Sequence, residues 1–487
     1  MQRAHDVETV RDAERSAMAA LPEGSLMDRA AAGLAAVLLR VLRQDGRPAY
    51  GRRVVLLVGP GDNGGDALLA GARLARRGVR VEALLLTPRA HPRGLAALAA
   101  AGGTVVTDPA VLRRADLVVD GLLGIGARAG LTGRAADWAR LLDDGAVPVV
   151  AVDLPSGVDP GTGELDGVHV RADLTVTFGT LKPALLLPPA SRVAGLVELV
   201  DIGMHPAPAA VVERLEPADL AALWPMPGAA DDKYRRGVVG VVAGGSTYPG
   251  AAVLCTGAAV RSGAGMVRYV GPPAATDLVR ARWPEVVPGQ GRVQAWVLGP
   301  GVDVSDETRA GAEGQREAVE QALASDLPCV VDAGALGLLG SRRDAPTLLT
   351  PHAGELARLL GAHGEPVERS AVEAAPARCA RRAAELTGAT VLLKGAVILV
   401  VGPDGPVRSQ AEGPHWLATA GSGDVLAGIA GTLLAAGLDP LDAAPLAVAA
   451  HGRAGALASA GGPVSASSVL DAVPSAVRAL LTGEPPH

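Results

Sequence analysis

Two glycine-rich turns in this 487-residue chain each lead into a stretch of helical pattern and carry carboxylates. The first, GPGDNGGD at 59–66, places Asp62, Asn63 and Asp66 close together. The second, AGSGD at 420–424, ends on Asp424. Amides at a helix start bind anions, and an aspartate there can accept a hydroxyl proton during phosphoryl transfer. The acidic first turn suits a cation or a sugar, whereas the second suits a phosphate.

Two further segments place acids where strands are expected to end. Asp120 lies in VVDGLLGIG, and Asp153 and Ser156 lie in AVDLPSGVD. Because ligands of open α/β sheets bind at the carboxyl ends of strands, these side chains are expected to converge with Asn63. Each aspartate taken alone is better explained as a helix cap or a turn former.

The elements that would position these residues follow an α/β pattern in both halves. Short Val/Ile/Leu runs alternate with Ala/Leu/Arg stretches of helical spacing, which is typical of parallel strands joined by crossover helices. Strands are expected at 52–59, 79–86, 116–122, 147–153 and 173–178, then at 236–245, 295–301, 328–336 and 347–355, with a hairpin over 391–410. A proline-rich stretch, 203–232, separates the two sets, so we predict domains at 1–215 and 216–487.

Composition narrows the classes of partner. The net charge is −6, and the arginines are scattered, which gives no reason to expect nucleic acid or a membrane surface. The N-terminus lacks the apolar core of a signal peptide. The odd, widely spaced set Cys255, Cys329 and Cys379 indicates buried thiols in a reducing compartment, and we expect a cytoplasmic protein.

The ordered motifs NGGD, DGLLGIG and VDLPSGVDPGTG, with LMDRAAAG at 26–33, resemble the NAD(P)H-hydrate epimerase family over about residues 7–205. The resemblance implies a Rossmann-like three-layer domain in which potassium is held by Asn63, Asp120 and Ser156. It also implies contacts to the hydrated dinucleotide from Asp62, Asn63, Gly64, Gly65, Asp66, Gly124, Ile125, Gly126, Ala127, Arg128, Ala129, Gly130 and Asp153. The family usually has asparagine at position 62 and glycine at position 67, where this chain has Asp62 and Ala67.

The implied epimerase reaction inverts the hydrated C6 of the nicotinamide ring through ring opening and reclosure. Proton transfer is needed at the ring nitrogen and at the hydroxyl, which a carboxylate can supply. Asp153 is the candidate acid/base, because it lies at a strand end beside the expected ligand.

In the second half, LGPG at 298–301, DAGAL at 332–336, TPHAGE at 350–355, VLLKG at 391–395 and GSGD resemble the ADP- or ATP-dependent NAD(P)H-hydrate dehydratases. These belong to the ribokinase-like α/β superfamily, and the match spans about residues 220–482. The resemblance implies that the hydrated dinucleotide contacts Ala252, Gly301, His352 and Asp424. It implies that the adenine nucleotide contacts Lys394, Gly395, Ala396, Val397, Ile398 and Gly423, and that Glu355 helps to hold Mg²⁺.

The implied dehydratase chemistry phosphorylates the C6 hydroxyl, with Asp424 as the base, and then eliminates phosphate to restore the dihydronicotinamide. Bacterial relatives favour ADP, although these residues do not separate ADP from ATP. Pro414 stands near a position where the family usually has asparagine. Relatives of both halves commonly self-associate, so a homo-oligomer is expected.

Two alternatives stay open at this point. Vitamin and sugar kinases share the GSGD turn, so the second half could instead phosphorylate an alcohol stably. The departures at Asp62 and Ala67 leave room for a first half that binds without catalysis.

Overall fold

The protein is described here by a computed structural model that covers residues 1–143, 145, 147–303, 312–340 and 342–483. The chain divides into two compact units between Glu213 and Arg214. The first unit comprises residues 2–213, and the second comprises the rest of the chain together with Met1. This division lies two residues from the boundary expected at 215.

The first unit is built on a seven-stranded parallel sheet in the order β4-β3-β2-β5-β6-β7-β8. Its strands are β2 (Arg53–Val58), β3 (Arg80–Leu85), β4 (Thr104–Val106), β5 (Leu117–Gly121), β6 (Val149–Val152), β7 (Leu174–Phe178) and β8 (Leu196–Val200). The order reverses between β2 and β5, which makes their carboxyl ends the switch point at which open α/β sheets bind ligands.

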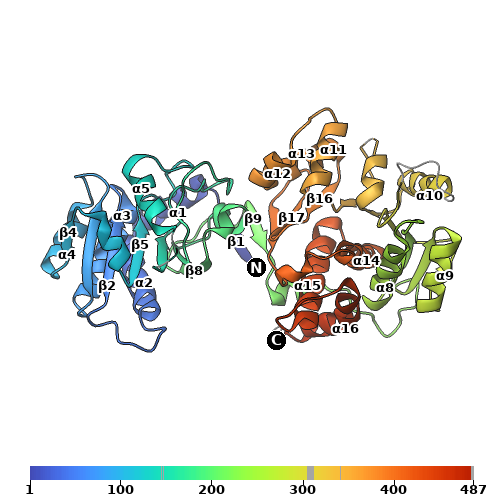
Figure 1. Cartoon of the computed structure of the whole chain (residues 1–487), viewed down its shortest axis with the longest axis horizontal. Helices are drawn as coiled ribbons and strands as arrows, with labels where there is room; N and C mark the ends of the chain where they lie inside the picture. Colours follow the sequence, from blue (N-terminus) through green and yellow to red (C-terminus); the bar gives the residue numbers. More distant parts are fainter. Residues whose placement is uncertain (144, 146, 304–311, 341, 484–487) are drawn as a thin grey trace. The chain divides into compact units, whose positions relative to one another are not determined.

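Helices cover both faces of this sheet because its central strands are apolar on both sides (Figure 1). Val54 and Leu56 point into the core beneath the N-terminal helices and α3, whereas Val55 and Leu57 face α5. The helical elements are α1 (Val7–Ala20), α2 (Ser25–Val41), α3 (Asp62–Ala75), α4 (Pro92–Ala100), η1 (Pro109–Arg114), α5 (Gly133–Leu142), α6 (Pro183–Leu186) and η2 (Ala190–Arg192). Short strands β1 (Gln2–Ala4) and β9 (Val212–Arg214) lie near the ends of the unit's sequence.

The second unit contains a mostly parallel sheet in the order β18-β17-β16-β15-β14-β13-β10-β11-β12. Its strands are β10 (Val238–Val242), β11 (Met266–Val270), β12 (Val287–Pro288), β13 (Ala295–Leu298), β14 (Cys329–Val331), β15 (Thr347–Leu349), β16 (Thr390–Leu393), β17 (Ile398–Val401) and β18 (Val407–Gln410). β17 is antiparallel to both β16 and β18, so the hairpin predicted over 391–410 is confirmed.

Small residues allow the helices of the second unit to pack closely (Figure 1). A Cβ at Gly428 on α14 would lie 2.3 Å from the carbonyl oxygen of Cys255 on α8. The helical elements are α7 (Pro217–Leu223), α8 (Pro249–Arg261), α9 (Pro273–Arg282), α10 (Ala312–Leu323), η3 (Ala333–Leu338), α11 (Ala353–Ala362), α12 (Arg369–Ala374), α13 (Pro376–Thr387), η4 (His415–Leu417), α14 (Ser422–Ala435), α15 (Pro440–Ser459) and α16 (Ala466–Thr482). The alanine-rich tracts are thus packed helices.

Three boundaries differ from those expected. Helix α3 begins at Asp62, so NGGD forms its first turns rather than a loop before it. DAGAL continues β14 as the 3₁₀ helix η3, and TPHAGE turns from β15 into α11. Asp332 and His352 are the N-cap residues of η3 and α11, whereas α3 begins directly after Gly61. The three cysteines are buried and free, as predicted, and within the described ranges no helix is long and apolar enough to cross a membrane.

Candidate active sites

Glycines bring the start of α3 against the end of β5 in the first unit. A Cβ at Gly59 would lie 1.8 Å from the carbonyl oxygen of Leu122, and one at Gly64 would lie 2.2 Å from that of Gly59. A Cβ at Gly124 would lie 2.5 Å from Asn63 Oδ1. Only glycine permits these approaches. The first motif therefore serves to place Asn63 beside the ends of β5 and β6.

Hydrogen bonds link the three residues expected to hold potassium. Asp120 Oδ1 accepts from Ser156 Oγ at 2.7 Å, and Asp120 Oδ2 accepts from the Ser156 backbone amide at 2.8 Å. The Asn63 amide donates to the carbonyl oxygens of Leu123 at 3.1 Å and Val152 at 2.7 Å. Ser156 Oγ in turn accepts from the Leu123 amide at 3.0 Å. The structure thus brings Asn63, Asp120 and Ser156 together at the switch point.

The chemistry of this group fits a monovalent cation. Asp120 is fully buried, and burial raises its pKa to about 6 against the lowering effect of the Ser156 hydrogen bonds. In the described part of the chain, its hydrogen bonds come from Ser156 and Leu122, not from lysine or arginine. A single buried carboxylate among neutral oxygen donors suits one positive charge. No cluster of three or more histidine, cysteine or acidic residues suited to a metal ion occurs among the described residues.

Asp153 follows β6 with φ +67°, a left-handed conformation that a non-glycine residue adopts at a cost. Lys182 Nζ donates to its Oδ1, and Thr177 Oγ1 donates to the same oxygen at 2.9 Å. Lys182 Nζ also donates to Thr177 Oγ1 at 3.0 Å and to the Phe178 carbonyl oxygen at 3.1 Å. Lys182 is only 2% exposed. Sequence reasoning missed Lys182, although a lysine within the apolar run LKPALLL was a usable signal.

Asp66 lies on the second turn of α3, and within the described part of the chain its buried Oδ1 has no hydrogen-bond partner. Burial raises the pKa of Asp66 well above its usual value, and the charges of Asp153, Asp62 and Glu14 raise it further, while Lys182 opposes them. Glu14 comes from α1, and its pKa is also raised by burial. Sequence reasoning gave Glu14 no role. These residues form an acidic group around one buried lysine.

The loop 124–130, predicted to contact the dinucleotide, approaches Asn63 at Gly124. Ile125 packs against the core under α3, and a Cβ at Gly126 would lie 3.3 Å from the Arg11 guanidinium. Gly130 has φ +84° and fits against the Asp166 carbonyl oxygen. Ala127, Arg128 and Ala129 complete the loop, with Arg128 exposed to solvent.

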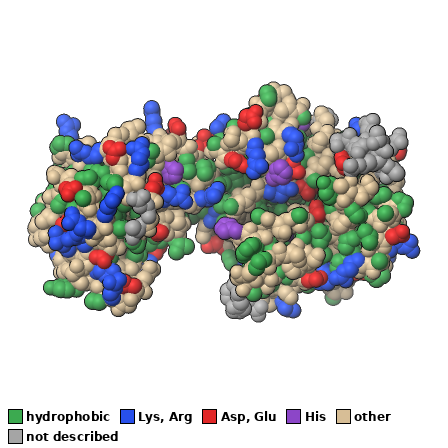
Figure 2. Space-filling model, viewed as in Figure 1, with side chains coloured by type: hydrophobic (Ala, Val, Ile, Leu, Met, Phe, Trp, Pro, Cys, Tyr) green, Lys and Arg blue, Asp and Glu red, His purple; other side chains and the backbone are tan. Residues whose placement is uncertain are grey.

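In the second unit, charged residues converge from three strand ends and one helix. Lys394, after β16, donates to Asp332 Oδ1, after β14, at 2.8 Å and lies 3.8 Å from Glu355 Oε2. Thr350, after β15, donates to Asp332 Oδ1 at 2.8 Å. Figure 2 shows acidic, basic and histidine side chains gathered on this unit between the α11–α13 and α14–α16 helices.

Asp424 lies in the first turn of α14 and is half-buried. Burial and then the negative charge of Asp332 raise its pKa to about 7, and Lys394 opposes them. A Cβ at Gly423 would lie 3.6 Å from Lys394 Nζ. A carboxylate whose pKa lies near neutral pH, a lysine and the N-terminus of a helix therefore lie side by side.

His352 and Glu355 form a reciprocal cap on α11. His352 Nδ1 accepts from the amides of Gly354 at 3.0 Å and Glu355 at 3.2 Å, while the Glu355 carboxylate accepts from the His352 amide at 2.8 Å. Lys394 donates its backbone amide to the Pro351 carbonyl oxygen, which brings this cap beside the β16–β17 turn. Gly395, Ala396 and Val397 form that turn, and Ile398 begins β17.

Ala252 and Gly301 approach each other through the start of α8. A Cβ at Gly244 would lie 2.7 Å from that of Ala252, and one at Gly301, where φ is +66°, would lie 2.5 Å from that of Ala251. The described contacts do not link this pair directly to Asp424 or Lys394. They place it at the carboxyl ends of β10 and β13, on the same edge of the sheet.

The structure also shows a residue with no sequence signal. His451, buried on α15, hydrogen-bonds through Nε2 to Ser422 Oγ at 3.0 Å, and burial lowers the pKa of His451 to about 4. A lone histidine in an alanine-rich helix gives no indication of this contact, which anchors the GSGD turn.

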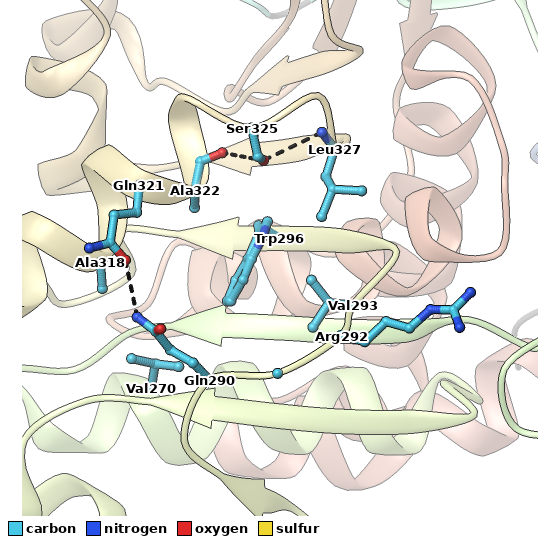
Figure 3. Close-up of a pocket in the computed structure, with 11 residues that line it drawn as sticks. Val270, Gln290, Arg292, Val293, Trp296, Ala318, Gln321, Ala322, Ser325 and Leu327 are labelled. Atoms are coloured by element: carbon cyan, nitrogen blue, oxygen red, sulfur yellow. Dashed lines mark hydrogen bonds between the residues drawn. The ribbon is translucent and has the colours of Figure 1, made fainter.

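One cavity of about 380 Å³ lies apart from the predicted residues, between α10 and the sheet (Figure 3). Trp296 and Val270 form its floor, and Gln290 donates to Gln321 at 3.2 Å across one side. None of the predicted site residues lines it.

Comparison with known proteins identifies both halves. A family model described as NAD(P)H-hydrate dehydratase matches residues 239–474, and one described as YjeF-related protein N-terminus matches residues 23–184. A bifunctional NAD(P)H-hydrate repair enzyme of Mycobacterium leprae is 47% identical over 497 residues, covering 99% of this chain and 100% of that protein. The chain belongs to the bifunctional NAD(P)H-hydrate repair enzyme family.

A second repair enzyme also matches most of this chain, and a solved structure matches part of it. The protein of Mycobacterium tuberculosis is 48% identical over 456 residues, with 91% of each chain covered. A crystal structure described as ADP/ATP-dependent NAD(P)H-hydrate dehydratase from Bacillus subtilis, co-crystallised with ATP/Mg²⁺, is 26% identical, with a TM-score of 0.48, and covers 54% of this chain and 97% of that chain. The family predicted from the motifs is confirmed, as is the α/β class of both halves, each built on a parallel or mostly parallel sheet.

Proposed function

We propose that this chain repairs hydrated NADH and NADPH. Its first domain, assigned to residues 1–215, interconverts the R and S hydrates, and its second, assigned to 216–487, dehydrates the S hydrate with an adenine nucleotide. The observation that carries the proposal is Asp424 at the start of α14, with its pKa raised to about 7, beside the Lys394–Asp332 pair. The relatives that match nearly the whole chain support both activities on one polypeptide.

In the dehydratase, Asp424 accepts the C6-hydroxyl proton as that oxygen attacks the terminal phosphoryl group. A base whose pKa lies near neutral pH suits this step. A useful fraction of it is ionised and can accept the hydroxyl proton, and it binds that proton well enough to keep it during the transfer. The N-terminus of α14 at 421–423 would stabilise the developing phosphate charge through its helix dipole and backbone amides. Loss of phosphate, assisted by the ring-nitrogen electron pair, then restores the dihydronicotinamide.

The dehydratase residues also fit Mg²⁺ carried with a nucleotide. Mg²⁺ is usually held by one or two carboxylates together with substrate phosphates and water, and Glu355 and Asp332 lie on either side of Lys394. When bound, Mg²⁺ neutralises phosphate charge. Lys394, with 395–398 and Gly423, would contact the nucleotide, while Ala252, Gly301 and His352 would contact the hydrated dinucleotide.

In the epimerase, potassium would be held by Asn63, Asp120 and Ser156, which hydrogen bonds through Leu123 link at the switch point. Bound there, it would offset the buried Asp120 charge and fix the loops at the ends of β5 and β6. The segments 62–66 and 124–130 and Asp153 would contact the hydrated ring and its phosphates.

The buried thiols support a reducing compartment, for which we propose the cytoplasm. We also propose that the chain forms a homo-oligomer.

The test supplies the full chain with S-hydrated NADH, ADP and Mg²⁺ and follows the absorbance of dihydronicotinamide, with ATP in a parallel assay. The proposal predicts recovery of NADH with release of phosphate. A stably phosphorylated alcohol with no NADH would indicate a small-molecule kinase and would refute the dehydratase assignment. A dehydratase that acts on the S hydrate while the full chain leaves the R hydrate unchanged would indicate a first domain that only binds.

A further inference from the structure

Two carboxylates of the first unit lie in opposite environments although they interact. Asp153 Oδ1 accepts from the Lys182 ammonium and the Thr177 hydroxyl, so this carboxylate is ion-paired and hydrogen-bonded. Among the described residues, Asp66 Oδ1 is buried without a hydrogen-bond partner, and it lies among the charges of Asp153, Asp62 and Glu14. Its environment favours a neutral carboxylic acid. Pairs of carboxylates divided in this way commonly serve as the acid and base of one reaction.

We propose that Asp66 and Asp153 are the acid and base of the epimerase, Asp66 carrying the proton and Asp153 the charge, with Lys182 as the positioning residue that fixes this division. The proposal rests on the epimerase function above and deepens it by assigning the proton transfers. The hydrogen bonds described for the Asp153 carboxylate all end on Oδ1, so Oδ2 is left to face a substrate.

The protons balance, because the two carboxylates together carry one proton before and after ring opening. Asp153 accepts the C6-hydroxyl proton as the C6–N1 bond breaks, the bonding electron pair passes to N1, and Asp66 protonates N1. The ring is then an open-chain aldehyde, and rotation about the C5–C6 bond presents its other face. N1 attacks that face, Asp66 takes back the N1 proton, and Asp153 returns its proton to the oxygen. Both carboxylates end as they began, so no co-reactant is needed.

Lys182 acts through Asp153 rather than on the substrate. Its Nζ makes all three described hydrogen bonds within the protein, to Asp153, Thr177 and Phe178. Asp153 has a left-handed backbone conformation at the end of β6. The other charges near the pair include Asp62 and Glu14, with Arg11 acting on Glu14. Lys182 is a buried cation that opposes the charges of Asp153, Asp62 and Glu14 on Asp66.

The test follows conversion of purified R-hydrated NADH into the S hydrate by the full chain without nucleotide, resolved by chromatography. Asp66→Asn is nearly isosteric, and we expect it to lower the epimerisation rate by about 10²- to 10⁴-fold. Its thermal unfolding temperature should stay equal or rise, and its dehydratase activity on the S hydrate should persist. Asp137→Asn, at an exposed carboxylate of α5 paired with Arg140, is the matched control and should epimerise normally.

Lys182→Met tests positioning separately. We expect kcat to fall while KM changes little, and we expect Lys182→Arg to restore much of the rate. An Asp66→Asn variant that epimerises at a rate near wild type, while Asp153→Asn does not, would overturn the pair. An unchanged kcat in folded Lys182→Met would overturn the role of lysine. If the unmodified chain does not interconvert the hydrates at all, the epimerase function itself fails.

Discussion

Replacing Asp424 with asparagine should change stability and activity in opposite directions. The folded-state pKa of about 7 lies well above the ordinary value of 3.8, because burial and the charge of Asp332 disfavour the ionised form. A group whose pKa is raised on folding costs nothing below the unfolded pKa. It destabilises the fold increasingly as pH rises from about 4 to about 7, and the penalty is constant above that.

The size of that penalty follows from the shift. Each pKa unit corresponds to about 1.4 kcal/mol, so the ionised Asp424 costs at most about 4 kcal/mol at pH 8, and water around the half-buried side chain reduces this to about 2–3 kcal/mol. Asp424→Asn should remove the penalty. Unfolding of the second unit should therefore shift to higher denaturant or temperature at pH 8 and change little at pH 4.

Catalysis should fall at the same time. Loss of the base should lower the dehydratase kcat by about 10²- to 10⁴-fold, with R-to-S epimerisation by the first unit unchanged. Unfolding is followed by circular dichroism at both pH values, and turnover by recovery of dihydronicotinamide. Asp439→Asn, which removes charge from an exposed helix cap on the same unit, is the control for a general charge effect. Equal stability of Asp424→Asn and wild type at pH 8 would refute the environment assigned to Asp424, and near-normal kcat would refute its role as base.

Three further outcomes are expected. Exchanging potassium for lithium should lower the epimerisation rate and leave the dehydratase rate unchanged. Asp120→Asn should make the epimerisation rate independent of the cation. An epimerisation rate of the unmodified chain that does not depend on the cation would refute the potassium site. Lys394→Met should raise the KM for nucleotide about 10-fold or more through loss of a charge-assisted contact, as measured by initial rates at varied ADP; an unchanged KM would place Lys394 in a structural role with Asp332. Ser422→Ala should cost about 1–3 kcal/mol by leaving His451 Nε2 buried without a partner, whereas His451→Leu with Ser422→Ala should recover part of that loss in denaturant unfolding.

The strand pattern and the motif order were enough to predict both α/β units, because buried parallel strands read as apolar runs and turns read as glycine-rich segments. The sequence also indicated that Asn63, Asp120 and Ser156 lie together, since the ends of parallel strands share one edge. It gave no indication of His451, and its signal for Lys182 was only a lysine within an apolar run. Their partners are set by packing between elements distant in sequence, and neither lies in a motif with fixed spacing.

The helix boundaries show the same limit. Asp62 was expected in a loop, and the structure places it in the first turn of α3, because Gly59 and Gly64 let the chain turn immediately after β2. A glycine-rich segment predicts such a turn. The length of the turn, however, depends on the close approach of Gly59 to Leu122, which follows the neighbouring strand β5.

The most direct test of two repair activities on one chain is the fraction of a mixed population of R and S hydrates that the full chain returns to NADH. The reaction is run with ADP and Mg²⁺ over a time in which the free hydrates do not interconvert. The account predicts recovery of both hydrates by the unmodified chain, and recovery of the S hydrate alone by Asp66→Asn. Recovery by the unmodified chain that stops at the S fraction, or that yields no NADH, would contradict it.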